Sequence, residues 1–98
     1  MFVHVALFRW VVGADASARE AVGVALADLP DQIDTLRSYR FGADVGLAEG
    51  NWHYAVVAEF DDVDGYLVYR DHPSHQAVLT DRILPILQER AAVQYETA

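Results

Sequence analysis

The residues best suited to chemistry lie close together between Tyr69 and His75, where a phenol and an imidazole flank a helix start. Pro73 suits the first helical position, because its φ is fixed and it has no amide hydrogen to lose there. His75 then falls in the first turn, where the partial positive charge of the helix N-terminus disfavours the imidazolium. A neutral imidazole is what a general base requires near neutral pH. We therefore predict a base at His75, with Tyr69 bonding its ring or holding a substrate oxygen.

The same stretch also permits a purely structural interpretation. His-Pro is a common helix start, and we expect His72 to cap the helix. His72 and His75 are three residues apart, as two metal ligands on one helix can be, but Pro73 places His72 outside the helix. No other His, Asp and Glu cluster is clear from the sequence, and we expect no metal.

The composition indicates one small acidic domain without cysteine. Ninety-eight residues suffice for a single domain with one core, and we assign residues 1–98 to it. The lack of cysteine excludes disulfides, thiolate catalysis and zinc-cysteine sites. Fifteen acidic against seven basic side chains give a net charge of −8, which opposes binding to nucleic acid.

No segment predicts a membrane anchor or a secretory leader. The apolar run over residues 2–8 contains His4, lacks a basic leader and is followed by Arg9 and Trp10, unlike a signal peptide. No apolar run is long enough to span a membrane. We therefore expect a cytoplasmic protein with no membrane partner.

The spacing of apolar residues predicts the order β-α-β-β-α-β without repeats or linkers. The expected strands cover residues 2–12, 35–45, 52–60 and 91–96. The expected helices cover residues 16–29, residues 63–69 and, after the His-Pro turn, residues 74–88. Ser17 and Glu20 have capping-box spacing, and Asp61 and Asp62 can cap the short helix. Pro85 removes one hydrogen bond of the last helix, so we expect a kink or break there.

The first and third strands are apolar on both faces, which has a consequence for assembly. In the first strand one face carries Phe2, Ala6, Phe8 and Trp10, and the other carries Val3, Val5 and Leu7. Two helices can cover only one face of a four-stranded sheet. We therefore predict a homodimer that buries the other face of the sheet.

Four segments carry a family resemblance. They are residues 3–8 (VHVALF), 54–60 (YAVVAEF), Tyr69 with residues 72–75 (HPSH), and residues 93–96 (VQYE). Together they resemble the stress-responsive A/B barrel family over essentially the whole chain. The resemblance implies an α+β fold, in which ferredoxin-like protomers pair into a dimeric α+β barrel and each has a pocket between sheet and helices.

The resemblance to polyketide cyclases of this family, of the olivetolic acid cyclase type, also implies an activity. These enzymes close a linear poly-β-keto thioester or acid by intramolecular aldol condensation without cofactor or metal. By that resemblance His75 matches the catalytic base, Tyr69 its partner and His4 a pocket histidine. A second pocket histidine falls at Tyr54 here, which implies a different pocket. Tyr54 and Trp52 are the remaining candidates for substrate binding, although packing would also explain them.

The chemistry also fits the residues themselves. A poly-β-ketone has acidic methylene protons, so a neutral imidazole can remove one while a phenol bonds the electrophilic carbonyl. An apolar pocket would hold the chain in its folded shape and keep water out. The leading prediction is a polyketide cyclase-like enzyme that acts on a small hydrophobic or aromatic molecule.

Two other functions remain open. A cofactor-free monooxygenase of the antibiotic-biosynthesis type shares the dimeric barrel, and Asn51-Trp52 together with Arg37 or Arg40 supply residue kinds that its site uses. A non-catalytic dimer that binds a hydrophobic ligand, or that serves only a structural role, would have the same fold. A cavity that reaches both His75 and Tyr69 favours catalysis, whereas a filled core there favours the non-catalytic dimer.

Overall fold

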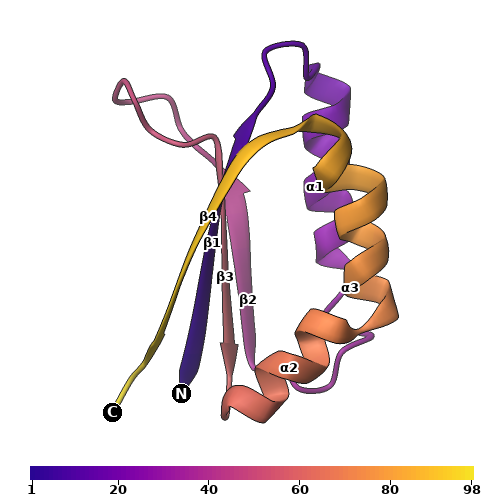
Figure 1. Cartoon of the computed structure of the whole chain (residues 1–98), viewed down its shortest axis with the longest axis vertical. Coiled ribbons are helices and arrows are strands. Elements are labelled where there is room, and N and C mark those ends of the chain that lie inside the picture. The colour runs from indigo at the N-terminus through magenta and orange to yellow at the C-terminus, as the bar shows by residue number, and fades with distance from the viewer.

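The computed structural model describes residues 1–98 and has two layers, with helices on one face of a four-stranded sheet (Figure 1). The strands are β1 (Phe2–Trp10), β2 (Ser38–Ala43), β3 (Tyr54–Phe60) and β4 (Leu87–Glu96). The helices are α1 (Ala16–Ala27), α2 (Val63–Asp71) and α3 (Pro73–Val78). The antiparallel sheet has the order β2-β3-β1-β4, which confirms the predicted ferredoxin-like α+β fold. No helix combines the length and apolar character needed to cross a membrane.

Strand β1 is central and pairs with both β3 and β4. His4 on β1 lies opposite Ala58 on β3 and Gln94 on β4. Because side chains alternate along a strand, the even-numbered residues of β1 share the face that the helices cover. These residues enter one core with α1 and the segment after it, formed among others by Phe2, Phe8, Trp10, Val22, Leu26, Leu29, Ile33, Val56 and Phe60.

The other face of the sheet carries no helix (Figure 1). The odd-numbered residues of β1 and β3 and their neighbours on β4 lie there, including Val5, Leu7, Val57, Val93 and Tyr95. Val93 is 64% exposed and Tyr95 is 50% exposed. The prediction that β1 and β3 are apolar on both faces is therefore confirmed, and one apolar face is uncovered in the single chain.

Aspartates begin the first two helices. The Ala18 amide donates to Asp15 Oδ1 at 2.8 Å, and the Gly65 amide donates to Asp62 Oδ1 at 3.0 Å. The capping role expected for Ser17 is wrong, because Asp15 supplies the acceptor and Ser17 already lies inside the helix. The cap expected at Asp62 is confirmed.

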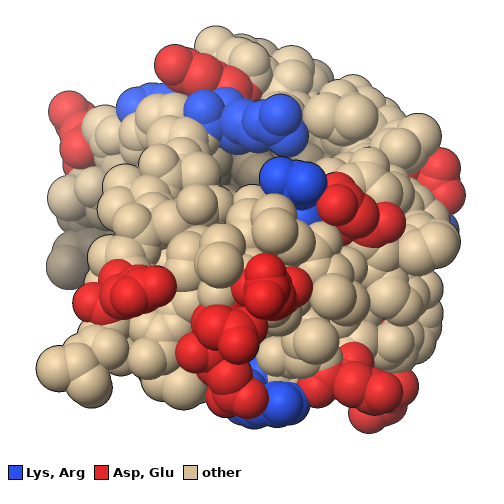
Figure 2. Space-filling model, turned by 60° about the horizontal axis from the view of Figure 1, so that its bottom comes forward, with Lys and Arg blue, Asp and Glu red and all other residues tan.

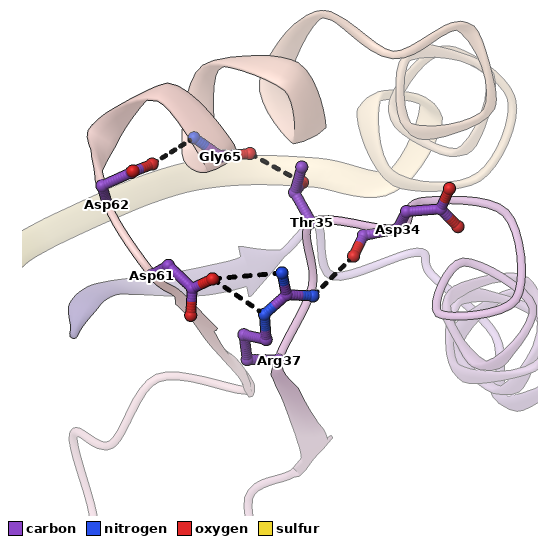
Figure 3. Close-up of polar contacts among 6 residues, drawn as sticks. All are labelled: Asp34, Thr35, Arg37, Asp61, Asp62 and Gly65. Carbon is purple, nitrogen blue, oxygen red and sulfur yellow. Dashed lines mark hydrogen bonds and ion pairs between the residues drawn. The ribbon is translucent and has the colours of Figure 1, made fainter.

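A polar network joins the segment before β2 to the turn between β3 and α2 (Figure 3). Arg37 Nε donates to Asp61 Oδ2 at 3.1 Å, and its Nη1 donates to the Asp34 carbonyl at 2.7 Å. The Thr35 hydroxyl donates to the Gly65 carbonyl at 2.8 Å. These contacts hold the start of α2 against the sheet and so help to position the residues at its other end.

The predicted last helix is broken into three parts. After α3, a π-helical turn covers Leu79–Ile83 and a 3-10 turn covers Leu84–Ile86. The break expected at Pro85 is confirmed, because the 3-10 turn contains it. The expected continuation to residue 88 is wrong, because β4 begins at Leu87 and pairs with the end of β1.

We expect Asp62→Ala to lower the free energy of unfolding by about 1 kcal/mol, because the Gly65 amide loses its cap. Urea denaturation measures this change. Asp64→Ala is the matched control, since Asp64 lies in the same turn without capping it, and Asp62→Asn should retain most of the stability. Equal losses in the two alanine variants would show that the cap contributes nothing specific.

Candidate functional site

A cavity of about 540 Å³ lies between the sheet and the helices. Its lining is mostly hydrophobic, and its polar residues come from several elements. The strands contribute His4, Tyr39, Arg90 and Gln94, and the helices contribute Tyr66, Tyr69, Arg70, His75 and Gln76. The cavity therefore combines an apolar wall with a few convergent polar groups, as small-molecule sites do.

His75 is half-buried at this cavity, and a backbone contact defines its tautomer. Its Nδ1 lies 3.0 Å from the carbonyl oxygen of Arg70. Because a carbonyl can only accept, Nδ1 carries the hydrogen and donates it. The lone pair is then on Nε2, which is the nitrogen left to accept a proton. The Gln76 amide donates to the same carbonyl at 2.6 Å and helps to hold this arrangement.

Tyr69 packs its ring on His75 and directs its hydroxyl elsewhere. The two ring centroids are 4.1 Å apart. The Tyr69 hydroxyl lies 2.9 Å from the hydroxyl of Tyr39 on β2. The structure thus brings Tyr69 and His75 together, but through ring contact, while the phenol bonds a second phenol that joins α2 to the sheet.

The two phenols form a neutral donor pair. Burial raises the pKa of Tyr69 to about 12, although the hydrogen bond between Tyr69 and Tyr39 opposes this rise. Burial also raises the pKa of Tyr39, and the neighbouring Tyr69 adds to the effect. Two protonated hydroxyls hold two hydrogens, and their mutual bond uses one. The other hydrogen is not used by this bond, and both tyrosines line the cavity.

His4 has the opposite tautomer to His75. The Gln94 side-chain amide nitrogen lies 3.0 Å from His4 Nδ1. Because an amide nitrogen only donates, His4 Nδ1 accepts and the hydrogen is on Nε2. His4 also contacts the ring of Tyr66, at a centroid distance of 4.9 Å. The cavity is therefore lined by one imidazole with a free acceptor and one with a free donor.

Both imidazoles are held in the neutral state. Desolvation lowers the pKa of His75 below its ordinary value of 6.5, although the bond to the Arg70 carbonyl acts in the other direction. Desolvation also lowers the pKa of His4, and the positive charge that His75 would carry lowers it further. At neutral pH His75 can therefore accept a proton, as a general base must.

Tyr54 and Trp52 lie away from this cavity. Tyr54 packs against Trp10 at a centroid distance of 5.9 Å and lines a separate hollow beside α1. Trp52 precedes β3, and the Arg9 guanidinium lies 4.5 Å from the centre of its ring, a cation–π contact. The structure does not bring these two expected substrate contacts to His75. Tyr54 lies at the first residue of β3 and lines the hollow beside α1, and Trp52 lies in the segment before that strand.

His72 caps α3 and is separate from the cavity. Its Nδ1 accepts from the Ser74 amide at 3.1 Å, so the expected capping role is confirmed. The chain contains no group of three His, Cys, Asp or Glu placed to share a metal ion.

Tyr39, Tyr66 and Gln94 line the cavity, and the sequence analysis did not select them. Tyr39 shares the helix-facing alternation of β2 with Phe41, which was the only available signal. Gln94 reaches His4 through a strand register between residues 90 positions apart, and no local pattern reports that register.

Comparisons with known proteins agree with the fold. The sequence model of the stress responsive A/B barrel domain matches residues 2–97, and no curated protein matches the chain. A solved dimeric ferredoxin-like protein of unknown function from Thermobifida fusca is 47% identical, with a TM-score of 0.91, over 98% of this chain and 90% of that one. A dimeric protein of unknown function from Bacteroides fragilis is 27% identical, with a TM-score of 0.85, over 98% and 95%. A hydroxynitrile lyase from Passiflora edulis is 13% identical, with a TM-score of 0.82, over 96% and 90%, and shares the fold.

We expect His75→Gln to raise the pKa of His4 toward its ordinary value of 6.5. The variant removes the positive charge that His75 carries when it is protonated, and that charge opposes the protonation of His4. Titration of the ring signals by NMR measures this change. His72→Gln is the matched control, since His72 lies outside the cavity, and it should leave the titration of His4 in place. If the pKa of His4 were the same in His75→Gln as in the unmodified protein, the two rings would not interact.

Proposed function

The chain belongs to the stress responsive A/B barrel domain family, and within it we propose a cofactor-free small-molecule enzyme with His75 as general base. Its specific form is polyketide cyclase-like chemistry, an intramolecular aldol condensation. One observation carries the proposal: a largely apolar cavity brings together a neutral imidazole with a free acceptor nitrogen and the hydroxyl pair of Tyr39 and Tyr69. A base and a hydroxyl donor in one largely apolar space are what such a condensation needs.

The proposed reaction moves one proton out and one back. His75 Nε2 takes a proton from a methylene between two carbonyls, and the resulting enolate attacks a more distant carbonyl of the same molecule. A carbon–carbon bond forms, and negative charge develops on the attacked oxygen. The free hydrogen of the phenol pair bonds that oxygen, and the imidazolium returns the proton. His4 Nε2 offers a further donor for a carbonyl of the substrate.

The apolar wall supports the same proposal. Phe8 and Val56 on the strands and Leu79 and Ile83 on the helical side give the cavity surfaces for a hydrocarbon chain. Holding a flexible chain in a folded form removes much of the entropic barrier to ring closure.

The positions of Arg37, Arg40 and Asn51 give little support to the monooxygenase alternative. Arg37 is bound to Asp61 and to the Asp34 carbonyl, and Asn51 donates to Asp44 at 3.1 Å. Neither Arg37 nor Asn51 lines the cavity, and neither does Arg40. The non-catalytic binding protein is the stronger second candidate, because the same cavity would suit a hydrophobic ligand.

We expect His75→Ala to abolish the cyclisation of linear 3,5,7-trioxo acids or their thioesters. Mass spectrometry of the cyclised product measures the rate. Tyr69→Phe should slow it by at least about tenfold, the scale of a lost acid-base or donor group. His72→Asn is the matched control, because it keeps a cap and lies outside the cavity. An unchanged rate in His75→Ala would rule out the mechanism, and no turnover in the unmodified protein would favour a binding role.

We further propose that two copies pair through the uncovered face of the sheet. The apolar side chains on that face support this assembly, since large exposed apolar surfaces mark interaction sites. The related proteins from Thermobifida fusca and Bacteroides fragilis, which are described as dimeric, add support.

We expect the chain of 10.9 kDa to show twice that mass in solution by light scattering. Val93→Glu should shift it toward the monomer, because a carboxylate would be buried in the sheet interface. Val24→Glu is the matched control, since Val24 is 70% exposed on α1 and Val93 is 64% exposed on β4. A dimer that survives Val93→Glu but not Val24→Glu would place the interface on the helices.

A further inference from the structure

The charges around the cavity differ from those of the chain as a whole. The sequence has fifteen acidic residues and seven arginines, with no lysine. No Asp or Glu lines the cavity, whereas Arg70 and Arg90 do. Figure 2 shows a hollow with basic side chains at its rim and acidic side chains on the surrounding surface. The cavity is lined by arginine and by no acidic side chain, although the protein as a whole is acidic. This charge distribution favours the binding of an anion in the cavity.

The two arginines are not equivalent. Arg70 holds both oxygens of Asp71, through Nε at 2.9 Å and Nη2 at 3.1 Å, so a carboxylate already offsets its charge. Arg90 belongs to none of the three ion pairs of the chain, which join Arg9 to Glu89, Arg37 to Asp61 and Arg70 to Asp71. Its guanidinium also makes no side-chain hydrogen bond, so its donors are free for a ligand.

The position of Arg90 on the sheet separates it from the proposed chemistry. Arg90 lies opposite Phe8, and Gln94 lies opposite His4, so both face the helices from β4. Four strand residues span about 13 Å between their Cα atoms. A ligand bound at Arg90 therefore passes along the apolar wall before it reaches His4 and His75.

We propose that the ligand of this cavity carries a free carboxylate, and that Arg90 binds it. The inference rests on the proposed function and names its substrate class: an amphipathic keto acid with its carboxylate at Arg90 and its reacting carbons at His75. A guanidinium matches a carboxylate with two parallel hydrogen bonds, which would also fix the direction in which the chain enters. Arg90 is in this sense a specificity residue.

A carrier thioester could offer phosphates to the same arginine, because guanidinium groups bind both anions. The charge of the protein favours the carboxylate. A single free arginine at the cavity balances one carboxylate, whereas a carrier with several phosphates would be repelled by a chain whose net charge is −8.

The test is a binding comparison that needs no turnover. Calorimetry with 4-hexylbenzoate and with 4-hexylbenzamide compares an acid with a neutral molecule of the same shape. We expect the protein to prefer the acid, and Arg90→Gln to weaken acid binding by about fivefold while leaving the amide unchanged. Arg82→Gln is the matched control, since Arg82 is exposed and does not line the cavity, and it should change neither.

Several results would overturn the inference. They are equal affinities for acid and amide, no saturable binding of the acid, or an Arg90→Gln variant that weakens both compounds alike. Competition by adenosine 3′,5′-bisphosphate that depends on Arg90 would assign the residue to the phosphates of a carrier instead. Turnover that depends on His75 without any preference for the acid would overturn this inference alone. Acid-selective binding at Arg90 with turnover independent of His75 would overturn only the proposed base.

Discussion

The structure depends on a central strand that must pack on both sides. Strand β1 is hydrogen-bonded to β3 and β4 along nearly its whole length, and its two faces are apolar. One helical layer covers only one of these faces, so the same strand contributes to the core, to the cavity and to an uncovered face. His4 is the one polar side chain that β1 presents to the helices, and it does so at the cavity.

The hydrogen-bond partners of the polar groups in the cavity determine which of their atoms remain free to donate or accept. A backbone carbonyl leaves His75 with a free acceptor, and a side-chain amide leaves His4 with a free donor. The Tyr39 and Tyr69 hydroxyls bond each other, which keeps one hydrogen available. Burial then keeps all four groups neutral, because desolvation penalises their charged forms. Acid-base capacity at neutral pH follows from this arrangement without any ionised partner.

The helical layer opens where the chain departs from α-helical geometry. The π-helical and 3-10 turns after α3 contribute Leu79, Ile83 and Leu84 to the cavity wall, and Pro85 lies in the second turn. The 3-10 turn that contains Pro85 is the last helical turn before β4, which begins at Leu87 and places Arg90 opposite Phe8. Local backbone chemistry thus places a cation at the cavity of an acidic protein.

The sequence by itself determined the element order, the two apolar faces of β1, the cap at Asp62, the break at Pro85 and the closeness of Tyr69 to His75. All of these follow from short-range rules of periodicity, capping and proline geometry. Only the tertiary structure decided that Tyr39 and Gln94 line the cavity, that Trp52 and Tyr54 do not, and which nitrogen of each histidine is free. The reason is that these contacts join distant segments through strand register, as between His4 and Gln94, and a local pattern does not encode register between strands.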